Sequence, residues 1–420
     1  MTNSENKALS GVLSAKTDPK DAEQRILTLV QGVAPQLGVI SVAINASKVS
    51  LNSVNGILQT PSKRYFFKLH AEAGDVEGLK NSEYYNSRIL SDAGWPVVEP
   101  VFTSRLPGSQ FVVYEYISAP TAFELYEKLE ESKENADELL VAEKTLARKV
   151  CKAYLSSLQE STREDIQAVS LNQLFYNRLV SKESRLEKYY LGKKVSLPEG
   201  EIAFDELAKM QWVINGVKYE KTLEDIIQSA KQLLDPAKEE RVATVIGHGD
   251  DHNGNRFFIG GEFKFFDTAF AGRQPALLSF IKATAHNTLL HPQWLYESEK
   301  LDGKLELKVS VKDARVTVDH NWKTEELSPL RMQILDIYAK EVWKPLLQEM
   351  SAKGMLPDYW REYIRVALFC CPFLVLNLIN GEKYAPPQSI LALSKCVELG
   401  AKGNTETIVG KFLKSIEPKV

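Results

Sequence analysis

The residues best suited to chemistry lie in one short stretch, residues 248–255, which reads HGDDHNGN, and in Asp267 just beyond it. An Asp and an Asn five residues apart on a turn, followed by an Asp after a hairpin at Gly260-Gly261, can direct three side chains at one point. Phosphoryl transfer needs a carboxylate to orient the attacking hydroxyl and oxygen ligands for Mg²⁺. Asp250 suits the first task, and Asn255 with Asp267 suits the second.

This pattern of His-Gly-Asp, four residues, Asn, a hairpin and Asp resembles that of the aminoglycoside phosphotransferase and choline kinase superfamily, whose members are related to protein kinases. The resemblance extends over about residues 41–285. It implies that Asp250 is the catalytic base and that Asn255 and Asp267 hold Mg²⁺. It also implies ATP, or GTP, as co-substrate and a small hydroxylated molecule as acceptor.

A lysine and a glutamate upstream of the loop fit the same resemblance. Lys68 ends a strand-like run, and Glu83 lies in the helical segment that follows it. In the family such a pair positions the α- and β-phosphates. Glu77 is the rival partner, but it lies among glycines close to the end of the strand, so we expect Lys68 to pair with Glu83. Each residue alone also fits an ordinary exposed charge.

Two further segments are candidate nucleotide contacts. The loop between the first two strands ends in Asn55 and Gly56, and backbone N–H groups beside a glycine can approach phosphate oxygens. It lacks a Walker or Gly-x-Gly-x-x-Gly pattern, so a plain hairpin turn explains it equally well. Glu115, Tyr116 and Ile117 follow an apolar strand and resemble the interlobe hinge whose backbone pairs with adenine. An ordinary strand end is the alternative.

The sequence departs from the family pattern near the loop. Where relatives carry an aspartate that braces the catalytic loop, this chain has Leu278, which leaves the bracing open. Asp251 and Asn253 are unusual residues inside the loop. We expect His248 to support the loop through backbone hydrogen bonds, and His252 either to contact the substrate or to support the loop.

The acceptor is expected between the catalytic loop and the helices that follow it, or near the middle of the helical insertion. The candidate residues are His291, Trp294, Tyr296, Tyr176 and Asn177. Core packing explains the aromatic ones equally well. Asp250 and Asp251 together predict an acidic site, which favours a sugar, amino sugar, aminoglycoside or amino alcohol as acceptor.

The elements that position these residues predict an α+β fold of two lobes, like that of a protein kinase. Residues 1–35 hold a polar segment and a short helix with Asp21 as its cap. Residues 36–117 alternate short strands with one main helix, which indicates a small antiparallel sheet lobe that binds the nucleotide. Residues 118–420 are mainly helical and include an insertion over 118–241 and the catalytic loop 248–255.

Hairpins interrupt the helical part. Asn215-Gly216 is a strong turn signal, and residues 305–318 form a second predicted hairpin around Asp313, of open role. Long helical patterns run over 139–159 and 171–190.

Composition narrows the class of protein. The 420 residues are 44% apolar and 25% charged, as in globular proteins, and a net charge of -3 argues against nucleic acid as partner. The four cysteines include no Cys-x-x-Cys pair, which indicates reduced thiols. The most apolar run, 366–379, is shorter than the ~20 residues of a membrane span, and the first twenty residues lack the apolar core of a secretory signal. We therefore expect a cytoplasmic protein without a membrane partner; the oligomeric state is not indicated.

Two other functions stay open. His248, Asp250, Asp251 and His252 could be ligands of a metal-dependent hydrolase, although no second cluster of His and Asp completes the set. A catalytically inactive, kinase-like nucleotide-binding protein is the other alternative, against which Lys68 and the intact loop argue. Phosphorylation of peptides is less favoured because the insertion over 118–241 resembles the acceptor-shaping region of small-molecule kinases.

Overall fold

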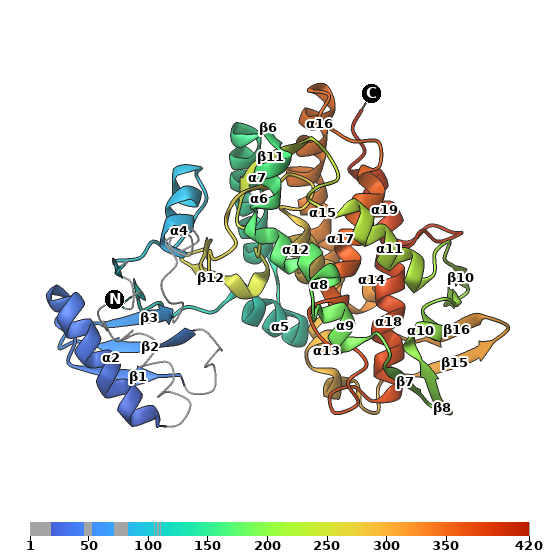
Figure 1. Ribbon diagram of the computed structural model, residues 1–420, viewed down its shortest axis with the longest axis horizontal. Coiled ribbons are helices and arrows are strands. Elements are labelled where there is room, and N and C mark those ends of the chain that lie inside the picture. Colours follow the sequence, from blue (N-terminus) through green and yellow to red (C-terminus); the bar gives the residue numbers. More distant parts are fainter. Residues whose placement is uncertain are drawn as a thin grey trace. The chain divides into compact units, whose positions relative to one another are not determined.

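The computed structural model describes residues 18–45, 53–70, 83–104, 106, 109 and 111–419. The chain divides into two compact units. Unit 1 comprises Met1–Asp92, Pro96–Ala119 and Lys264–Phe270, and unit 2 comprises Ala93–Trp95, Pro120–Phe263 and Ala271–Val420. Unit 1 is built around a sheet and unit 2 is mainly helical (Figure 1), which confirms the predicted α+β fold class.

Unit 1 contains a five-stranded sheet in the order β1-β2-β3-β5-β4, with every neighbouring pair antiparallel. The strands are β1 (Ser41–Ile44), β2 (Ser53–Gln59), β3 (Arg64–His70), β4 (Phe102–Ser104) and β5 (Phe111–Glu115). Within the described residues of unit 1, the sheet is accompanied by the α-helices α2 (Pro19–Val33) and α4 (Glu83–Asp92). The predicted antiparallel sheet is therefore present.

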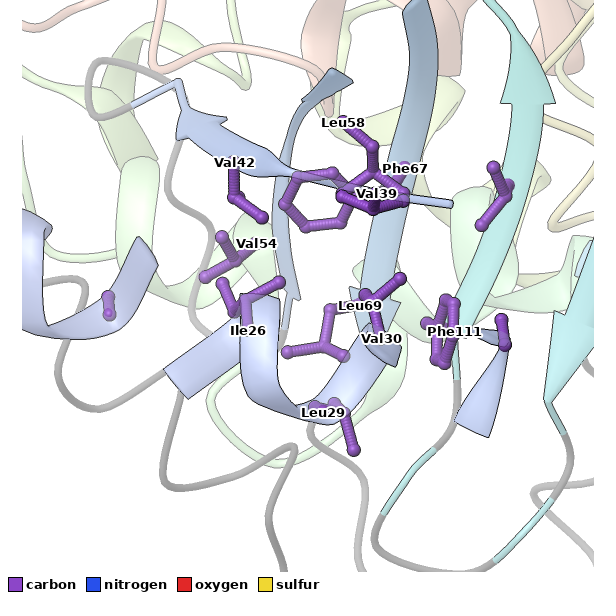
Figure 2. Close-up of a cluster of buried hydrophobic side chains, with 13 residues drawn as sticks. Ile26, Leu29, Val30, Val39, Val42, Val54, Leu58, Phe67, Leu69 and Phe111 are labelled. Atoms are coloured by element: carbon purple, nitrogen blue, oxygen red, sulfur yellow. The ribbon is translucent and has the colours of Figure 1, made fainter. Parts of the chain in front are cut away.

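Helix α2 packs against the sheet and contributes to the hydrophobic core of unit 1. Figure 2 shows Ile26 and Val30 of α2 beside Val54 and Leu69 of the sheet, all within one buried apolar cluster. Apolar residues four apart lie on one helix face, so burial of this face explains why the helix docks here. The segment 1–35, predicted as separate, thus contributes its helix to the sheet lobe.

The cap of α2 differs from the prediction. Asp18, not Asp21, caps the helix, because its Oδ1 accepts the N–H groups of Lys20 and Asp21, each at 3.1 Å. Asp21 lies inside the first turn and pairs with Arg25 one turn later, at 2.6 Å. Pro19 at the first helical position moves the start of the helix upstream of the apolar pattern.

Unit 2 is a set of packed helices, of which α17 and α18 lie side by side (Figure 1). The longer ones are α5 (Ala122–Ser132), α6 (Asp137–Ser157), α11 (Leu223–Leu233), α15 (Pro329–Tyr338), α16 (Lys344–Ala352), α17 (Trp360–Phe373), α18 (Pro386–Gly400) and α19 (Ile408–Ser415). The predicted helix over 139–159 corresponds to α6. The one over 171–190 is instead broken into a 3-10 turn, α8 (Tyr176–Val180) and α9 (Arg185–Tyr189).

The predicted insertion contains strands as well as helices. Asn215 and Gly216 both adopt positive φ, 46° and 79°, and join β9 (Gln211–Ile214) to β10 (Val217–Lys218) as a hairpin. The second predicted hairpin is also present, as β15 (Leu307–Lys312) and β16 (Arg315–His320). Strand β16 pairs in parallel with β9, so the two hairpins form one four-stranded sheet.

A central strand carries the chain into the predicted catalytic loop. Strand β11 (Arg241–Gly247) lies between β6 (Gln159–Thr162) and β14 (Gly272–Pro275) in a three-stranded sheet. After the loop, β12 (Arg256–Ile259) and β13 (Glu262–Phe265) pair across Gly260 and Gly261, whose φ angles are 57° and 82°. Within the described residues, every helix falls short of the length or apolarity that crossing a bilayer demands.

Candidate active site

Hydrogen bonds inside residues 248–255 fix the loop as a compact turn. The side-chain amide of Asn255 donates to the backbone carbonyl of Asp250 at 2.8 Å, and the backbone N–H of Asn255 donates to the carbonyl of His252 at 2.9 Å. His252 also accepts the N–H of Gly254 on Nδ1, at 3.1 Å. Because the amide nitrogen of Asn255 is engaged, its side-chain oxygen is the atom that can bind a cation.

His248 supports the backbone of the loop. Its ring is fully buried, and Nδ1 accepts the N–H of Asp250 at 3.4 Å. This matches the supporting role expected of it.

Asp250 is half-buried and lies close to basic side chains of unit 2. Its Oδ1 lies 3.6 Å from the Lys282 ammonium, and its Oδ2 lies 3.8 Å from Nε2 of His252. Burial raises the pKa of Asp250, but Lys282, His252, His248 and Arg178 together outweigh burial and hold that pKa below its ordinary value. Asp250 is therefore ionised at neutral pH, as a base must be.

The neighbouring carboxyl has the opposite environment. Asp251 is fully buried, and its Oδ1 accepts the N–H of Ala283 at 3.1 Å. Burial, with the charge of Asp250, raises the pKa of Asp251 to about 7. Asp251 therefore adds less negative charge near neutral pH than its position next to Asp250 implied, and the charges of Lys282 and Arg178 act on Asp250.

Asn287 braces the loop from outside. Its side-chain oxygen accepts the N–H of Asn253 at 2.6 Å, and its amide donates to the Tyr338 hydroxyl at 3.0 Å. The hydroxyl of Tyr338 donates to Oε2 of Glu143, at 3.0 Å. Leu278, at the position of the expected brace, is buried among apolar residues. The loop is held by an amide rather than by the expected carboxylate.

The same network fixes the chain directly after the loop. Arg256, next to Asn255, forms a fully buried ion pair with Glu143, with Nη2 to Oε1 at 2.6 Å and Nη1 to Oε2 at 3.1 Å. Burial lowers the pKa of Arg256, but the Glu143 carboxylate outweighs it and keeps that pKa above its ordinary value. A bidentate pair of this kind sets the direction in which β12 leaves the loop.

Unit 1 holds the other half of the predicted site. The Lys68 ammonium, on β3, lies 3.0 Å from Oδ1 of Asp267. Asp267 reaches unit 1 because Phe265 exchanges backbone hydrogen bonds with Pro96 and Val98, each at 2.8 Å. Its φ of 53° is left-handed, which is uncommon for a residue other than glycine.

For Glu83, the predicted partner of Lys68, the structure describes the backbone but not the side chain. Glu83 is the first residue of α4, but its side chain lies outside the described residues. Its pairing with Lys68 therefore stays a prediction. The same helix contacts the Asp267 segment through Asn86, whose amide donates to the Ala269 carbonyl at 3.1 Å.

Asn55 and Gly56 are not in a loop, contrary to the prediction. They lie inside β2, opposite Lys68 and Phe67 of β3. A side chain at Gly56 would place its Cβ 2.2 Å from the Ala43 carbonyl oxygen, so glycine is required by close strand approach and not by a turn. The connection between β1 and β2, residues 46–52, lies outside the described residues.

The three residues predicted to form the hinge lie at the end of β5 and directly after it. Glu115 ends β5 opposite Tyr65. Tyr116 donates its N–H to the Arg64 carbonyl at 3.2 Å, and the Arg64 guanidinium lies 4.3 Å from the centre of its ring. The N–H of Ile117, by contrast, has no backbone acceptor within the described ranges.

Of the predicted acceptor residues, Tyr296 lies near the loop. Its hydroxyl is 3.0 Å from Nδ1 of His286, and burial followed by the Asp250 charge raises the pKa of Tyr296. Trp294 is instead fully buried, and Nε2 of His291 is 3.5 Å from a carboxylate oxygen of Glu130. Trp294 is thus part of the buried core, and His291 is engaged with Glu130.

Three residues near Asp250 were missed from the sequence: Arg178, Lys282 and His286. Lys282 and His286 are four residues apart, on one face of the helical turns that begin with α12 (Ile281–Thr284). That spacing was the available signal. Arg178 gave none, since it lies far from the loop in sequence.

The structure brings Lys68 and Asp267 together in unit 1, and Asp250 and Asn255 together in unit 2. The described part of the chain has no group of three or more His, Cys, Asp or Glu side chains placed to hold a metal ion. His248 and Asp251, two ligands of the alternative hydrolase centre, instead accept backbone N–H groups.

Comparisons with known proteins bear on the fold of the chain. No family model and no curated protein sequence matches the chain. Among solved structures, amicoumacin kinase hAmiN in complex with AMP-PNP, Ca²⁺ and Ami matches with a TM-score of 0.50, 15% identity and coverage of 92% of this chain and 95% of that chain.

Two other matches have lower scores. A choline/ethanolamine kinase family protein from Mesorhizobium loti has a TM-score of 0.44, 12% identity and coverage of 96% of this chain and 99% of that chain. Aminoglycoside phosphotransferase APH(4)-Ia has a TM-score of 0.44, 11% identity and coverage of 89% of this chain and 99% of that chain. The match to amicoumacin kinase shows that this chain has the two-lobed, kinase-like fold that its sequence motif predicted.

Proposed function

We propose that this protein is a small-molecule kinase that transfers the γ-phosphate of ATP, or GTP, to a hydroxyl group of a small acceptor. The observation that carries the proposal is the state of Asp250. This carboxylate is kept ionised by neighbouring cations, and its Oδ1 is buried without a hydrogen-bond partner among the described residues. This oxygen can therefore accept a hydrogen bond from the hydroxyl group of the substrate that receives the phosphate.

Asp250 acts on the acceptor hydroxyl. It accepts the hydroxyl's hydrogen bond, orients the oxygen for attack and takes the proton as the bond to phosphorus forms. Lys282, 3.6 Å from the carboxylate, adds positive charge where the transferred group is negative. The bracing by Asn287 keeps the loop in place during this step.

The nucleotide and metal fit the remaining groups. The side-chain oxygen of Asn255 and the carboxylate of Asp267 are the hard oxygen donors that Mg²⁺ prefers. When bound, Mg²⁺ would neutralise phosphate charge. Lys68 would contact the phosphates, and the backbone N–H of Ile117 would donate a hydrogen bond to the nucleotide base. The complex of amicoumacin kinase with AMP-PNP and Ca²⁺ supports a nucleotide and a divalent cation here. We expect the reaction to occur in the cytoplasm.

Two aspartate variants test the proposal by separating chemistry from binding. We expect Asp250→Ala to lower kcat by roughly 10²–10⁴-fold while leaving Mg²⁺-nucleotide affinity nearly unchanged, because the base touches the acceptor. Asp267→Ala should instead weaken Mg²⁺-nucleotide binding. Asp313→Ala, at the exposed tip of the β15–β16 hairpin, is the matched control.

The measurements are calorimetric titration with Mg²⁺-ATP and Mg²⁺-GTP, and nucleoside diphosphate release over a panel of acceptors. The panel contains sugars, amino sugars, amino alcohols and their carboxylated and phosphorylated forms. Full turnover by the Asp250→Ala variant would overturn the base assignment. Absence of Mg²⁺-nucleotide binding by the unaltered protein would overturn the proposed function.

A further inference from the structure

An arginine that forms no ion pair or hydrogen bond within the described residues lies near the proposed base. Arg178, on α8, is half-buried, and within the described residues it forms no ion pair or hydrogen bond. Burial, followed by the charge of Arg185, lowers the pKa of Arg178 to about 10, so it stays cationic at pH 7. Partly removing a guanidinium from water without a protein partner is costly, and a bound anion would offset that cost.

A second cation lies between α8 and the loop. Lys282 is buried, with its ammonium 3.6 Å from Asp250 and 6.0 Å from the ring centre of Phe175, the residue that precedes α8. Both Arg178 and Lys282 lower the pKa of Asp250, so the three charges belong to one cluster.

The cluster carries excess positive charge. Arg178 and Lys282 are opposed by the single carboxylate of Asp250. Asp251 compensates little, because burial raises its pKa to about 7 and its Oδ1 accepts a backbone N–H. Arg185 adds charge nearby, although its guanidinium also donates to the carbonyls of Leu374 and Val375, at 2.8 and 2.9 Å.

A buried histidine adds an unpartnered polar atom at the same place. Burial, then Lys282, His252 and Arg178, lower the pKa of His286, so its ring is neutral. Its Nδ1 is 3.0 Å from the Tyr296 hydroxyl, and its buried Nε2 has no hydrogen-bond partner in the described part of the chain. If the hydroxyl donates to Nδ1, the proton is on Nε2, which can then donate to an oxygen of a ligand.

We propose that the acceptor is an anionic hydroxy compound, carrying a carboxylate or phosphate group, and that Arg178 and Lys282 bind this anion beside Asp250. The proposal rests on the proposed function, since it names the substrate class of the same site. Arg178 binds the remote anionic group of the acceptor. Lys282, whose ammonium lies 3.6 Å from the carboxylate of Asp250, binds the same group on the side of the base.

The first test measures anion binding without catalysis. Inorganic phosphate is titrated into the full chain at constant ionic strength, without nucleotide, and binding is followed by calorimetry. We expect Arg178→Gln to weaken phosphate binding roughly tenfold or more and Arg178→Lys to weaken it less, since the charge is kept. Arg148→Gln, an exposed arginine of α6 paired with Glu341, is the control and should bind phosphate normally.

The second test uses matched acceptors that differ in charge: D-glucose (neutral), D-glucosamine (cationic), D-gluconate (carboxylate) and D-glucose 6-phosphate (phosphate). A second set consists of the neutral, amino, carboxylate and phosphate forms of a three-carbon alcohol. We expect turnover to favour the anionic members, and Arg178→Gln to raise their KM roughly tenfold with little change in kcat. The KM for ATP in acceptor-independent hydrolysis should stay unchanged. A raised KM for ATP would mean that Arg178 binds the nucleotide and would overturn the proposal.

The two proposals fail in different ways. Binding of Mg²⁺-ATP together with unaltered phosphate binding by Arg178→Gln, or a preference for neutral or cationic acceptors, would overturn the anionic acceptor and leave the kinase intact. Failure to bind Mg²⁺-nucleotide would overturn the kinase, and the phosphate titration would still decide whether Arg178 forms an anion site.

Discussion

At the scale of single residues, the surroundings shift the pKa values of two adjacent carboxyl groups in opposite directions. Asp250 has Lys282 at 3.6 Å and a lowered pKa, whereas Asp251 is fully buried and has a pKa raised to about 7. Such a separation is typical of sites where one group works as a base and another does not.

The buried carboxyl predicts a pH-dependent stability. Because the folded pKa of Asp251 is about 7 and its ordinary value is 3.8, the folded chain holds a proton that the unfolded chain has lost between these values. This contribution is fully present below about pH 4 and is lost as pH rises through about 7. Asp251→Asn keeps a neutral oxygen for the Ala283 N–H and has no such loss.

We therefore expect the free energy of unfolding of the Asp251→Asn variant, relative to the unaltered protein, to rise between about pH 4.5 and pH 7.5. The expected change is on the order of a few kcal/mol. Urea denaturation at both pH values measures it, and Asp313→Asn on the exposed hairpin is the control. A pH-independent difference would contradict the buried, proton-holding state of Asp251.

The sequence predicted the residues that form a local pattern and missed those assembled by tertiary contacts. Asp250 and Asn255 are linked across five residues of one turn, and their spacing alone indicated it. Arg178 lies on another helix, so only the folded chain places it in the cluster with Asp250. Adjacency in sequence does not reveal which of two carboxyl groups is buried.

At the scale of elements, the catalytic loop depends on a helical segment for its shape. Asn287 lies in the π-helical turn Ala285–Leu289 that continues α12, and its side chain connects the N–H of Asn253 to the hydroxyl of Tyr338 on α15. The π-helical turn changes the direction of side chains relative to a regular α-helix. The side-chain amide of Asn287 can accept a hydrogen bond from the loop, which the apolar side chain of Leu278 cannot do.

Removal of this amide should loosen the loop. We expect Asn287→Ala to lower kcat about tenfold to a hundredfold, because the base is displaced, and to cost about 1–3 kcal/mol of stability, because the Asn253 N–H loses its acceptor. Mg²⁺-nucleotide affinity should change little. Steady-state kinetics and denaturation measure these effects.

Thr288→Val is the matched control for this prediction. Thr288 is buried in the same turn, but its hydroxyl donates to the Thr284 carbonyl and not to the loop. The control should retain kcat. Equal kcat in both variants would show that the Asn287 contact does not position Asp250.

The elements themselves were predicted unevenly, for physical reasons. Asn215-Gly216 forms the predicted hairpin because both residues adopt the positive φ that the turn requires. The same dipeptide at Asn55-Gly56 lies inside β2, where the glycine makes room for the Ala43 carbonyl. Only the neighbouring strand distinguishes the two uses, and a single sequence does not show it.

At the scale of the whole molecule, the predicted catalytic groups are divided between two units with separate cores. Unit 1 contains Lys68 and Asp267, and its apolar cluster joins α2 to the sheet. Unit 2 contains Asp250 and Asn255. Unit 1 is also discontinuous, since residues 264–270 reach it after the chain has passed through unit 2.

Separate cores predict that the two units lose stability separately. Ile26 on α2 and Ile364 on α17 are both buried, with exposed fractions of 1% and 0%, so truncation of either to alanine should cost about 2–5 kcal/mol. We expect Ile26→Ala to accelerate hydrogen exchange in β2 and β3, and Ile364→Ala to accelerate it in α18, which packs against α17.

Hydrogen exchange measured by mass spectrometry on matched peptides distinguishes the outcomes, with each variant acting as the control for the other. Exchange confined to the unit that carries the substitution would mean that each unit can open while the other stays folded. Equal acceleration in β3 and α18 by either variant would contradict separate cores, and the two units would then unfold as one cooperative body.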